Sequence, residues 1–188
     1  GEYQTLAINP AWADLEDDAV AENNDPEFIN KVVRPINAQD GDLLPVSTFK
    51  GIEDGTWQQG TARYEKRGVA VDVPVWDVNK CIQCNQCSYV CPHAAIRPVA
   101  MTEAEAAAAP EGMQYKDMTG MPGYKFAITI SAYDCTGCGS CVNVCPDKIQ
   151  AITMQNFEEN EAEQAYFDYG VSVPDKAEVI AKFKENTV

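Results

Sequence analysis

The chain has 188 residues and a formal net charge of −15, from 14 basic and 29 acidic side chains. This excess of acid argues against a general affinity for nucleic-acid phosphates or anionic membrane surfaces, both of which bind basic patches. The sequence shows no run of 18 or more apolar residues and no secretion signal. We therefore expect a cytoplasmic protein that has no membrane-spanning helix and binds no nucleic acid.

The first 72 residues combine one short helical pattern with a long irregular stretch. Apolar side chains recur at helical spacing over residues 28–33, and we expect Pro35 to end that helix. Residues 35–74 contain five glycines and three prolines. This composition favours extended, irregular chain, so we interpret residues 1–72 as a linker module.

The middle of the chain contains an internal repeat. Stretches typical of short strands, at 73–78 and 126–133, each lead into a group of four cysteines. A proline follows each group, and we expect it to open a short helical turn before a second strand, near 97–99 and 151–154. The sequence thus predicts an α+β domain over residues 73–155, built from two similar halves.

An insert at about 100–124 separates the two halves. Thr102 and Glu105 have the spacing of a capping box, which predicts a short alanine-rich helix inside the insert. The rest of the insert is rich in glycine and proline and is expected to be loop.

The tail, residues 156–188, shows two helical patterns, and we expect Gly170 and Pro174 to break them. In the last pattern Val179, Ile180 and Phe183 are predicted to lie on one side of a helix. We interpret this helical tail as the entrance to a further domain.

The eight cysteines follow the spacing Cys-x2-Cys-x2-Cys-x3-Cys-Pro, twice. This is the spacing of bacterial ferredoxins with two [4Fe–4S] clusters, in which the fourth cysteine of each run ligates the other cluster. The expected ligands of cluster one are Cys81, Cys84, Cys87 and Cys145. The expected ligands of cluster two are Cys135, Cys138, Cys141 and Cys91.

The residues between the cysteines suit such loops. Gly137 and Gly139 allow the backbone a positive φ close to a cluster. Asn85 occupies the position of Gly139 in the first loop, and asparagine tolerates this conformation better than most residues. Pro92 and Pro146 have no N–H group that needs a partner.

Two other interpretations of the cysteines are weaker. Structural zinc is usually held by two separated pairs of ligands, which is not the spacing found here. Clusters that only brace the fold would not require two adjacent sites with exchanged ligands. We therefore predict outer-sphere transfer of single electrons between two clusters, with no catalytic residue and no bond made or broken in this chain.

Residues 44–98 carry a resemblance that extends beyond the cysteines, including the YEKRG segment at Tyr64–Gly68. This stretch resembles the central region of pyruvate:ferredoxin (or flavodoxin) oxidoreductases, and the similarity continues through the second cysteine group. Residues 1–43 and 100–124 match that family only loosely. The resemblance implies that the chain is a fragment that contains the linker and the two-cluster ferredoxin-like domain.

The resemblance also implies cofactors and partners outside this chain. Enzymes of this family cleave pyruvate with thiamine diphosphate, magnesium and coenzyme A, and a third, proximal cluster passes electrons onward. The fragment would then relay electrons from the thiamine site to external ferredoxin or flavodoxin, in contact with the remaining domains of the parent enzyme. Such clusters suit a reducing, low-oxygen cytoplasm.

Three alternatives remain open from the sequence. The chain could be a free-standing two-cluster ferredoxin, although such a carrier has no use for the linker. It could be the electron-transfer part of an enzyme that acts on another 2-oxoacid. It could also be a non-redox sensor whose clusters report iron or oxygen.

A few further residues are expected to have structural roles. His93, the single histidine, is expected to be a partly exposed residue next to a ligand. Trp57 and Trp76 are expected to pack in the core and not to serve as electron bridges near a cluster. The charges of the Glu65–Lys66–Arg67 triplet are expected to anchor the linker, and the acidic run at 158–163 is expected to form a solvated helix face.

Overall fold

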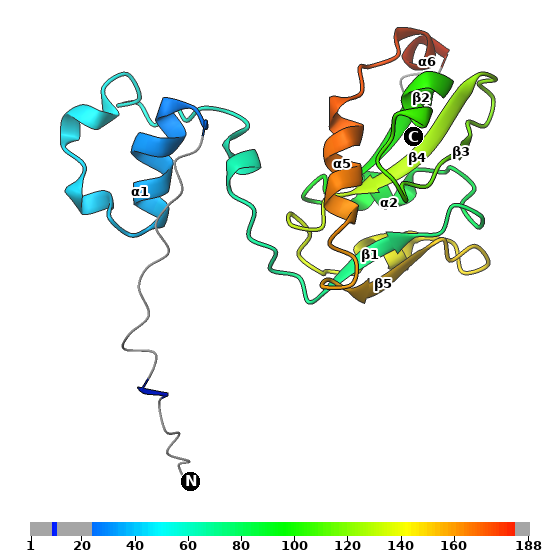
Figure 1. The fold of residues 1–188 in the computed structure, drawn as a ribbon, viewed down its shortest axis with the longest axis horizontal. Coiled ribbons are helices and arrows are strands. Elements are labelled where there is room, and N and C mark those ends of the chain that lie inside the picture. Colours follow the sequence, from blue (N-terminus) through cyan, green and yellow to red (C-terminus); the bar gives the residue numbers. More distant parts are fainter. Residues whose placement is uncertain (1–8, 11–23, 183–188) are drawn as a thin grey trace, which may run out of the picture. The chain divides into compact units, whose positions relative to one another are not determined.

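The computed structural model describes residues 9, 10 and 24–182, and Figure 1 shows its ribbon. The chain divides into two compact units, residues 1–64 and 65–188. Across the described residues, no helix has the length and apolar character that crossing a bilayer requires.

The first unit contains the predicted helix, which begins as a π-turn, η2 (Ile29–Val33), and continues as α1 (Arg34–Asn37). The expected apolar face is confirmed, because Val32 and Val33 are buried together with Ile29. The expectation that Pro35 ends the helix is wrong. Proline clashes with the carbonyl four residues earlier in a regular α-helix, and the π-turn widens the helix where this clash would arise.

The remainder of the first unit has little regular structure. Over residues 38–64 it forms three 3₁₀ turns, namely η3 (Gly41–Leu43), η4 (Val46–Phe49) and η5 (Thr61–Tyr64). Phe28 and Trp57 pack edge to face with their ring centroids 5.0 Å apart. Aromatic contacts of this kind stabilise a segment that has few backbone hydrogen bonds. Trp57 is nevertheless 43% exposed, so the expectation that it packs in the core is wrong.

The second unit has two small antiparallel sheets. In one, β1 (Asp72–Trp76) pairs with β5 (Ile152–Asn156). In the other, β4 (Tyr124–Ile130) lies between β2 (Ile96–Thr102) and β3 (Lys116–Asp117). The four strands expected from the repeat are present, with slightly different ends. The sequence missed β3, because two residues are too few to show an alternating pattern.

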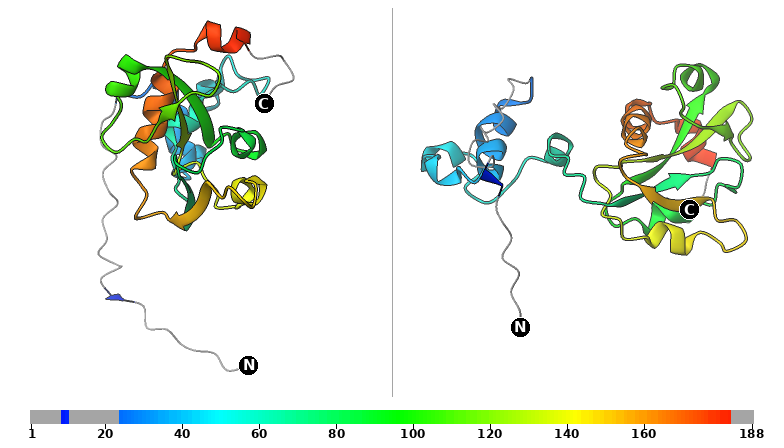
Figure 2. Two further views of the ribbon diagram at one scale, coloured as in Figure 1. Left: turned by 90° about the vertical axis from the view of Figure 1, so that its right-hand side faces the viewer. Right: turned by 60° about the horizontal axis from the view of Figure 1, so that its bottom comes forward.

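A short helix lies inside each cysteine group, α2 (Gln86–Val90) and α4 (Ser140–Val144). These helices precede the prolines, where no helix was expected. The expected helical turn after Pro146 is present, because the N–H groups of Ile149 and Gln150 donate to the Pro146 carbonyl at 2.7 and 3.1 Å. The same expectation is wrong for Pro92, since residues 92–93 form only a short turn. A proline disfavours helical backbone in the residue before it. Accordingly Cys91 and Cys145 are extended, with ψ angles of 112° and 125°, and end the two helices. In Figure 2, α2 and α4 lie side by side, on the opposite side of the sheets from α5.

The insert contains the predicted helix, α3 (Glu103–Ala107), and its capping box is confirmed. The backbone N–H of Glu105 donates to Thr102 Oγ1 at 3.3 Å, and the N–H of Thr102 donates to the Glu105 carboxylate at 2.7 Å. Both hydrogen bonds satisfy backbone donors that a helix start leaves free.

The tail forms α5 (Glu163–Ser172) and α6 (Ala177–Lys182). Pro174 lies between the two helices, as expected, but Gly170 lies within α5, so the expected break at Gly170 is wrong. A Cβ at this glycine would lie 2.8 Å from Val99 Cγ2 and 3.0 Å from Thr129 Cγ2. Glycine is therefore required by the close approach of α5 to β2 and β4, and not by a break in the helix.

The expected apolar stripe on the last helix is only partly present. Val179 is 9% exposed, whereas Ile180 is 63% exposed. The two side chains therefore do not share a buried face, and the third predicted member, Phe183, lies outside the described residues.

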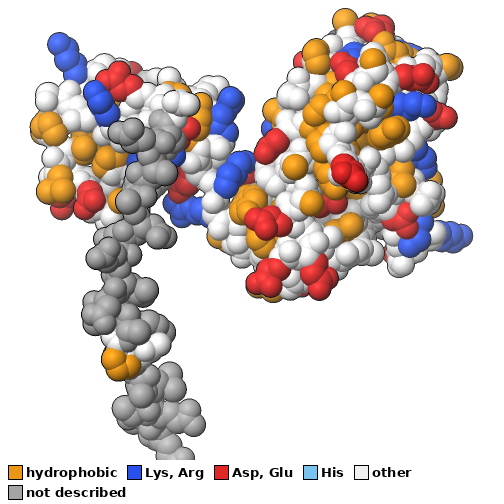
Figure 3. Space-filling model, viewed as in Figure 1, with side chains coloured by type: hydrophobic (Ala, Val, Ile, Leu, Met, Phe, Trp, Pro, Cys, Tyr) orange, Lys and Arg blue, Asp and Glu red, His pale blue; other side chains and the backbone are white. Residues whose placement is uncertain are grey.

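The main core of the second unit draws on both sheets, with tyrosines of α5 packed against it. Cys141 belongs to this core, and Cys81, Cys87 and Cys91 pack against it. Figure 3 shows acidic side chains at several places on the visible face around it. The buried core side chains include Trp76, Ile96, Met101, Phe126, Ile128, Ile130 and Ile152.

Candidate functional site

Two cavities in the second unit bring the eight cysteines together. Cavity one is lined by three cysteines of the first group and the last cysteine of the second. Cavity two is lined by three cysteines of the second group and the last cysteine of the first. The cysteines of cavity one are Cys81, Cys84, Cys87 and Cys145. The cysteines of cavity two are Cys135, Cys138, Cys141 and Cys91.

This grouping coincides with the two ligand sets expected from the spacing, and each set crosses between the repeats. The crossing follows from the fold, because α2 and α4 lie against each other and the extended residue after each helix leads toward the neighbouring cavity. That these thiols ligate clusters in these two sets remains a prediction.

The remaining walls of both cavities are mainly apolar. Cavity one is closed by the indole of Trp76 and by isoleucines from β4, from β5, from the first cysteine loop and from the turn after Pro146. Cavity two is closed by side chains of β1, β2 and β5. Apolar walls limit the access of water, which lowers the local dielectric and affects the potential of a redox centre. These wall residues include Trp76, Ile128 and Ile152 in cavity one, and Pro74, Ile96 and Met154 in cavity two.

Backbone N–H groups point at the first sulfur of each group. Gln83 N–H donates to Cys81 Sγ at 3.3 Å, and Gly137 N–H donates to Cys135 Sγ at 3.3 Å. Hydrogen bonds to sulfur stabilise negative charge on it and are one means by which proteins tune iron–sulfur centres. The two loops therefore have the same donor at the same position.

Positive φ angles give the loops this shape, and those expected are confirmed. Gly137 and Gly139 have φ angles of 69° and 73°, and Asn85 has a φ of 58°. Asn85 and Gly139 are the N-cap residues of α2 and α4. A left-handed residue at this point turns the chain from the loop into the helix.

Gln83 also has a positive φ, of 60°, and the sequence analysis missed it. Its side chain explains how a residue other than glycine is held there. Gln83 Nε2 donates to the carbonyl of Asp117 at 2.8 Å, and Gln83 Oε1 accepts from Thr119 N–H at 2.9 Å. Superposing the two cysteine groups would have revealed the position, because Gln83 stands where the second group has Gly137.

Burial affects the thiols strongly. It raises the pKa of Cys87 to about 12 and that of Cys141 to about 11. Cys138 is exposed, and hydrogen bonding with Ser140 lowers its pKa. Thiols with raised pKa values are protonated at neutral pH, so a metal centre that binds them must displace protons.

The residues around cavity one fit an iron–sulfur cluster in a further respect. The indole nitrogen of Trp76 and Oδ1 of Asn85 are buried and have no hydrogen-bond partner within the described part of the chain. Buried polar atoms are usually paired, and the sulfurs of a cluster would be acceptors for the indole N–H. Among the residues described, no three His, Cys, Asp or Glu side chains form a site for a single metal ion.

His93 and Trp76 occupy the surroundings expected for them. His93 is exposed and lines cavity two, and Trp76 is 6% exposed and packs edge to face with Phe126 at 6.1 Å between ring centroids. The eight cysteines account for both cavities, so neither residue is required as a ligand.

The expectation of a solvated helix face at 158–163 is wrong in two respects, because residues 158–162 form turns and bends before α5 begins and Glu163 is partly buried. This residue lines a small cavity together with Val75, Trp76 and Tyr166, and burial raises the pKa of its carboxyl to about 7. No periodic pattern signals this burial, because Glu163 begins α5 and its surroundings come from distant segments.

Replacing Glu163 with glutamine is expected to remove a pH dependence of stability. The carboxyl of Glu163 has an ordinary pKa of 4.5 and a pKa of about 7 in the folded chain, so the folded chain binds the proton more tightly than the unfolded chain. This stabilisation of the fold is complete below pH 4.5 and is lost as the pH rises through 7. Between pH 6 and 8 the free energy of unfolding of the wild type should fall by about 1 kcal/mol more than that of Glu163→Gln. Denaturant titrations of the cluster-loaded chain at both pH values measure this difference. The exposed Glu159→Gln is the control, and equal slopes in all three proteins would contradict the assignment.

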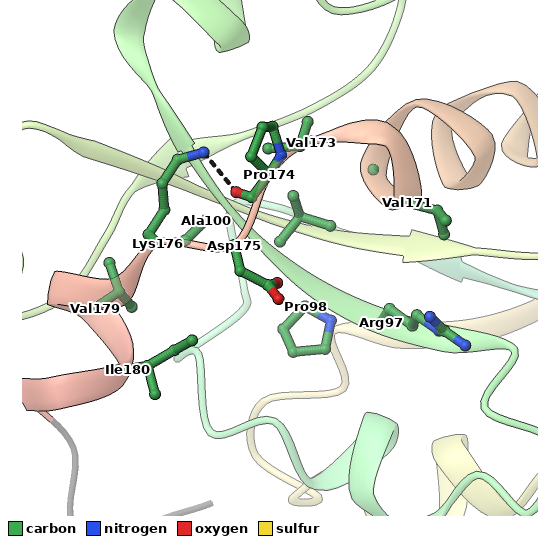
Figure 4. Close-up of a pocket in the computed structure, with 12 residues that line it drawn as sticks. Arg97, Pro98, Ala100, Val171, Val173, Pro174, Asp175, Lys176, Val179 and Ile180 are labelled. Atoms are coloured by element: carbon green, nitrogen blue, oxygen red, sulfur yellow. Dashed lines mark hydrogen bonds between the residues drawn. The ribbon is translucent and has the colours of Figure 1, made fainter.

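A larger surface cavity, of about 270 Å³, lies between β2 and the C-terminal helices (Figure 4). The two basic side chains that line it, Arg97 and Lys176, already have partners. Lys176 Nζ donates to the Pro174 carbonyl and to Glu105, and the guanidinium of Arg97 lies 5.6 Å from the centre of the Phe167 ring. No cysteine lines this cavity, so it is separate from the candidate redox site.

Comparison with known proteins agrees with the two-cluster interpretation. Residues 80–149 match the family of 4Fe-4S dicluster domains, and residues 15–70 match the EKR family, described as a domain of unknown function. The domain over 80–149 therefore binds two [4Fe–4S] clusters.

Curated relatives cover nearly the whole chain. It is 51% identical over 182 residues to the pyruvate:ferredoxin oxidoreductase of Moorella thermoacetica, with 95% of this chain and 15% of the relative aligned. It is 47% identical over 178 residues to the pyruvate-flavodoxin oxidoreductase of Enterobacter agglomerans, with the same coverage. It is also 45% identical over 166 residues to the pyruvate dehydrogenase [NADP(+)] of Cryptosporidium parvum, covering 86% of this chain and 8% of the relative.

The chain thus spans only about 15% of the length of the first two relatives. The resemblance expected from the YEKRG segment and the cysteine groups is confirmed. The chain is therefore homologous to one segment of the pyruvate:ferredoxin and pyruvate-flavodoxin oxidoreductases, a segment that includes their 4Fe-4S dicluster domain.

Proposed function

We propose that residues 73–155 transfer single electrons between two [4Fe–4S] clusters held in cavities one and two. The observation that carries this proposal is the convergence of four cysteines on each cavity, with each set drawn from both repeats. When bound, the clusters supply one-electron chemistry. The proposed ligands are Cys81, Cys84, Cys87 and Cys145 for cluster one, and Cys135, Cys138, Cys141 and Cys91 for cluster two.

The residues of the chain would bind the clusters, shield them and adjust their potentials. The N–H groups of Gln83 and Gly137 stabilise negative charge on the sulfurs of Cys81 and Cys135. The apolar walls keep water away from the centres. Apart from the cysteines, His93 is the one acid–base group among the described residues that line the two cavities, which favours a relay over a catalytic centre.

We further propose that the chain acts as part of a larger oxidoreductase. The names of the relatives give pyruvate as the substrate, so we propose the same 2-oxoacid here. Thiamine diphosphate, magnesium, coenzyme A and a third cluster would be bound by other parts of the parent enzyme. Residues 1–72 would be the linker and residues 156–188 the tail leading to the next domain, all in a low-oxygen cytoplasm.

External ferredoxin or flavodoxin is the proposed acceptor. One relative is named for NADP(+) instead, so similarity over this segment does not by itself determine the acceptor. A free-standing ferredoxin is the second candidate, and the electron-transfer part of an enzyme for another 2-oxoacid is the third. An iron or oxygen sensor would have the same cysteines but would lose iron when it responds.

Anaerobic reconstitution of the purified chain tests the proposal. We expect about eight iron atoms per chain and two one-electron steps that cycle reversibly in a redox titration followed by EPR. With pyruvate, thiamine diphosphate, magnesium and coenzyme A supplied, the chain alone should form no acetyl-CoA. Loss of iron on each redox cycle would favour the sensor, and acetyl-CoA formation would show that a substrate site is present here.

A further inference from the structure

The Glu65–Lys66–Arg67 triplet has no part in the proposed electron relay, yet it lies beside one of the two candidate sites. It begins a segment, residues 65–72, that leads into β1 within the second unit. This segment, called here the support segment, contacts the loop that carries the second cysteine group at three points. The contacts are a side-chain ion pair, a backbone hydrogen bond and close packing.

The ion pair joins Lys66 to Asp134, the residue immediately before Cys135. Both side chains are shielded, with 27% of Lys66 and 29% of Asp134 exposed. Asp134 also lies 2.6 Å from the hydroxyl oxygen of Ser131, which is fully buried. Removing one partner of a shielded pair lowers stability more than removing one partner of an exposed pair, because the remaining side chain is left without its counter-charge.

The network continues from Ser131 into α5. Ser131 Oγ lies 2.9 Å from Gln164 Oε1, which also accepts from the N–H of Tyr133 at 3.2 Å. Gln164 in turn donates to Asp168 at 2.8 Å. Lys66 is therefore connected through Asp134 to the rigid helix behind the loop.

The backbone of the support segment lies directly against the same loop. Gly68 N–H donates to the Tyr133 carbonyl at 3.1 Å, and a Cβ at Gly68, where φ is +57°, would lie 3.1 Å from the Tyr133 ring. A Cβ at Gly137 would lie 3.3 Å from the carbonyl oxygen of Asp72 and 3.5 Å from Ala70 Cβ. The loop around Cys135 is thus shaped by residues of the support segment.

We propose that Lys66 is a positioning residue for the site formed by Cys135, Cys138 and Cys141. It fixes Asp134 at the start of the loop and neutralises a carboxylate that would otherwise stand next to a negatively charged cluster. The proposal rests on the two-cluster function and assigns a role to the EKR segment, which reaches residue 70 in the family match. The role is to support the second cluster loop.

The other loop provides a matched comparison. Lys116 Nζ donates to the carbonyls of Val78 and Cys81, at 2.8 and 2.9 Å, and so holds the start of the first cysteine loop. Each cysteine loop is therefore held by one lysine that lies outside that loop, Lys116 for the first loop and Lys66 for the second. If both act locally, their loss should affect different clusters.

The test compares Lys66→Met, Lys66→Arg, Lys116→Met and Arg67→Gln in the reconstituted chain of 188 residues. Arg67 is 69% exposed and pairs with Glu65, so Arg67→Gln is a control for charge alone. The measurements are the rate of iron release to a chelator and the reduction potential of each cluster. The same lysine substitutions are also made in chains that carry Cys84→Ser or Cys138→Ser, each of which disturbs one cluster. The spectra of these double variants identify the cluster that each lysine affects.

In Lys66→Met we expect half of the iron to be released about tenfold faster. A change of this size is typical when a residue that orients a metal ligand is removed. The potential of the cluster at Cys135 should become more negative, and the other cluster should be unchanged. Lys116→Met should show the opposite selectivity, while Lys66→Arg and Arg67→Gln should resemble the wild type. Asp134→Asn added to Lys66→Met should restore part of the potential, because it removes the unpaired carboxylate.

Equal effects of Lys66→Met on both clusters, or no effect on either, would overturn the proposal. If that variant does not fold, Asp134→Asn alone still provides the test, since it breaks the same ion pair and should loosen the same cluster. A wild-type chain that binds fewer than two clusters would instead contradict the proposed function, so the two failures can be distinguished.

Discussion

Replacing Cys145 with serine is expected to abolish the cluster whose other three ligands are Cys81, Cys84 and Cys87, and to leave the second cluster in place. The reason is the crossed arrangement of the cavities, in which Cys145 lines cavity one although it follows the second cysteine group. A serine hydroxyl is a poor ligand for iron compared with a thiolate. We expect about half of the iron to be lost on reconstitution.

Cys91→Ser is the reciprocal variant and should abolish the other cluster, because Cys91 lines cavity two. EPR spectra of the two variants distinguish the cluster that survives in each, and double variants show which cysteines ligate that cluster. Cys91→Ser combined with Cys138→Ser should bind iron as well as Cys91→Ser alone. Ligand sets that each come from a single cysteine group would reverse these patterns and contradict the crossed arrangement.

Removal of both clusters is expected to unfold one part of the second unit and leave another. The sheet of β1 and β5 has only two strands, and such pairs are marginally stable alone. Its inner side chains, Pro74 and Trp76 among them, form walls of the two cavities. Without the clusters this sheet and both cysteine loops lose most of the contacts that stabilise them, because cluster binding contributes directly to folding.

The three-stranded sheet should remain folded in the cluster-free chain. Its strands pack against α5, and Phe126, Ala127 and Ile130 in β4 are almost fully buried. Hydrogen exchange should therefore become about a hundredfold or more faster at 72–91 and 135–156 after chelation, a loss of roughly 3 kcal/mol or more in local stability. Exchange at 96–102 and 124–130 should change little. A uniform change over all these segments would show that the unit unfolds as a whole.

The features that the sequence predicted well are those determined locally. The alternating strands, the capping box of Thr102 and Glu105, and the positive φ at Asn85 each depend on a few neighbouring residues. The chemistry of the site was also predictable, because cluster ligands within one group must be close in the chain. The comparison with known families supports the two clusters themselves.

The features that the sequence did not predict depend on distant contacts or on competition between local effects. Gly170 suggested a helix break because its packing against Val99 cannot be read from α5 alone. Glu163 looked solvated because its cavity is formed partly by β1 and the insert. The short helices were misplaced because the effect of Pro92 on the residue before it outweighs the preference of proline for a helix start.

The antiparallel pairing of β1 with β5 has a consequence for the architecture of a longer polypeptide. Asp72, the first residue of β1, lies opposite Asn156, the last residue of β5, and Phe157 N–H still donates to the Val71 carbonyl at 2.9 Å. The segment that carries both cysteine groups therefore begins and ends at one edge. The chain before this segment and the chain after it are held side by side, so they need not move apart to accommodate the cysteine-bearing segment between them.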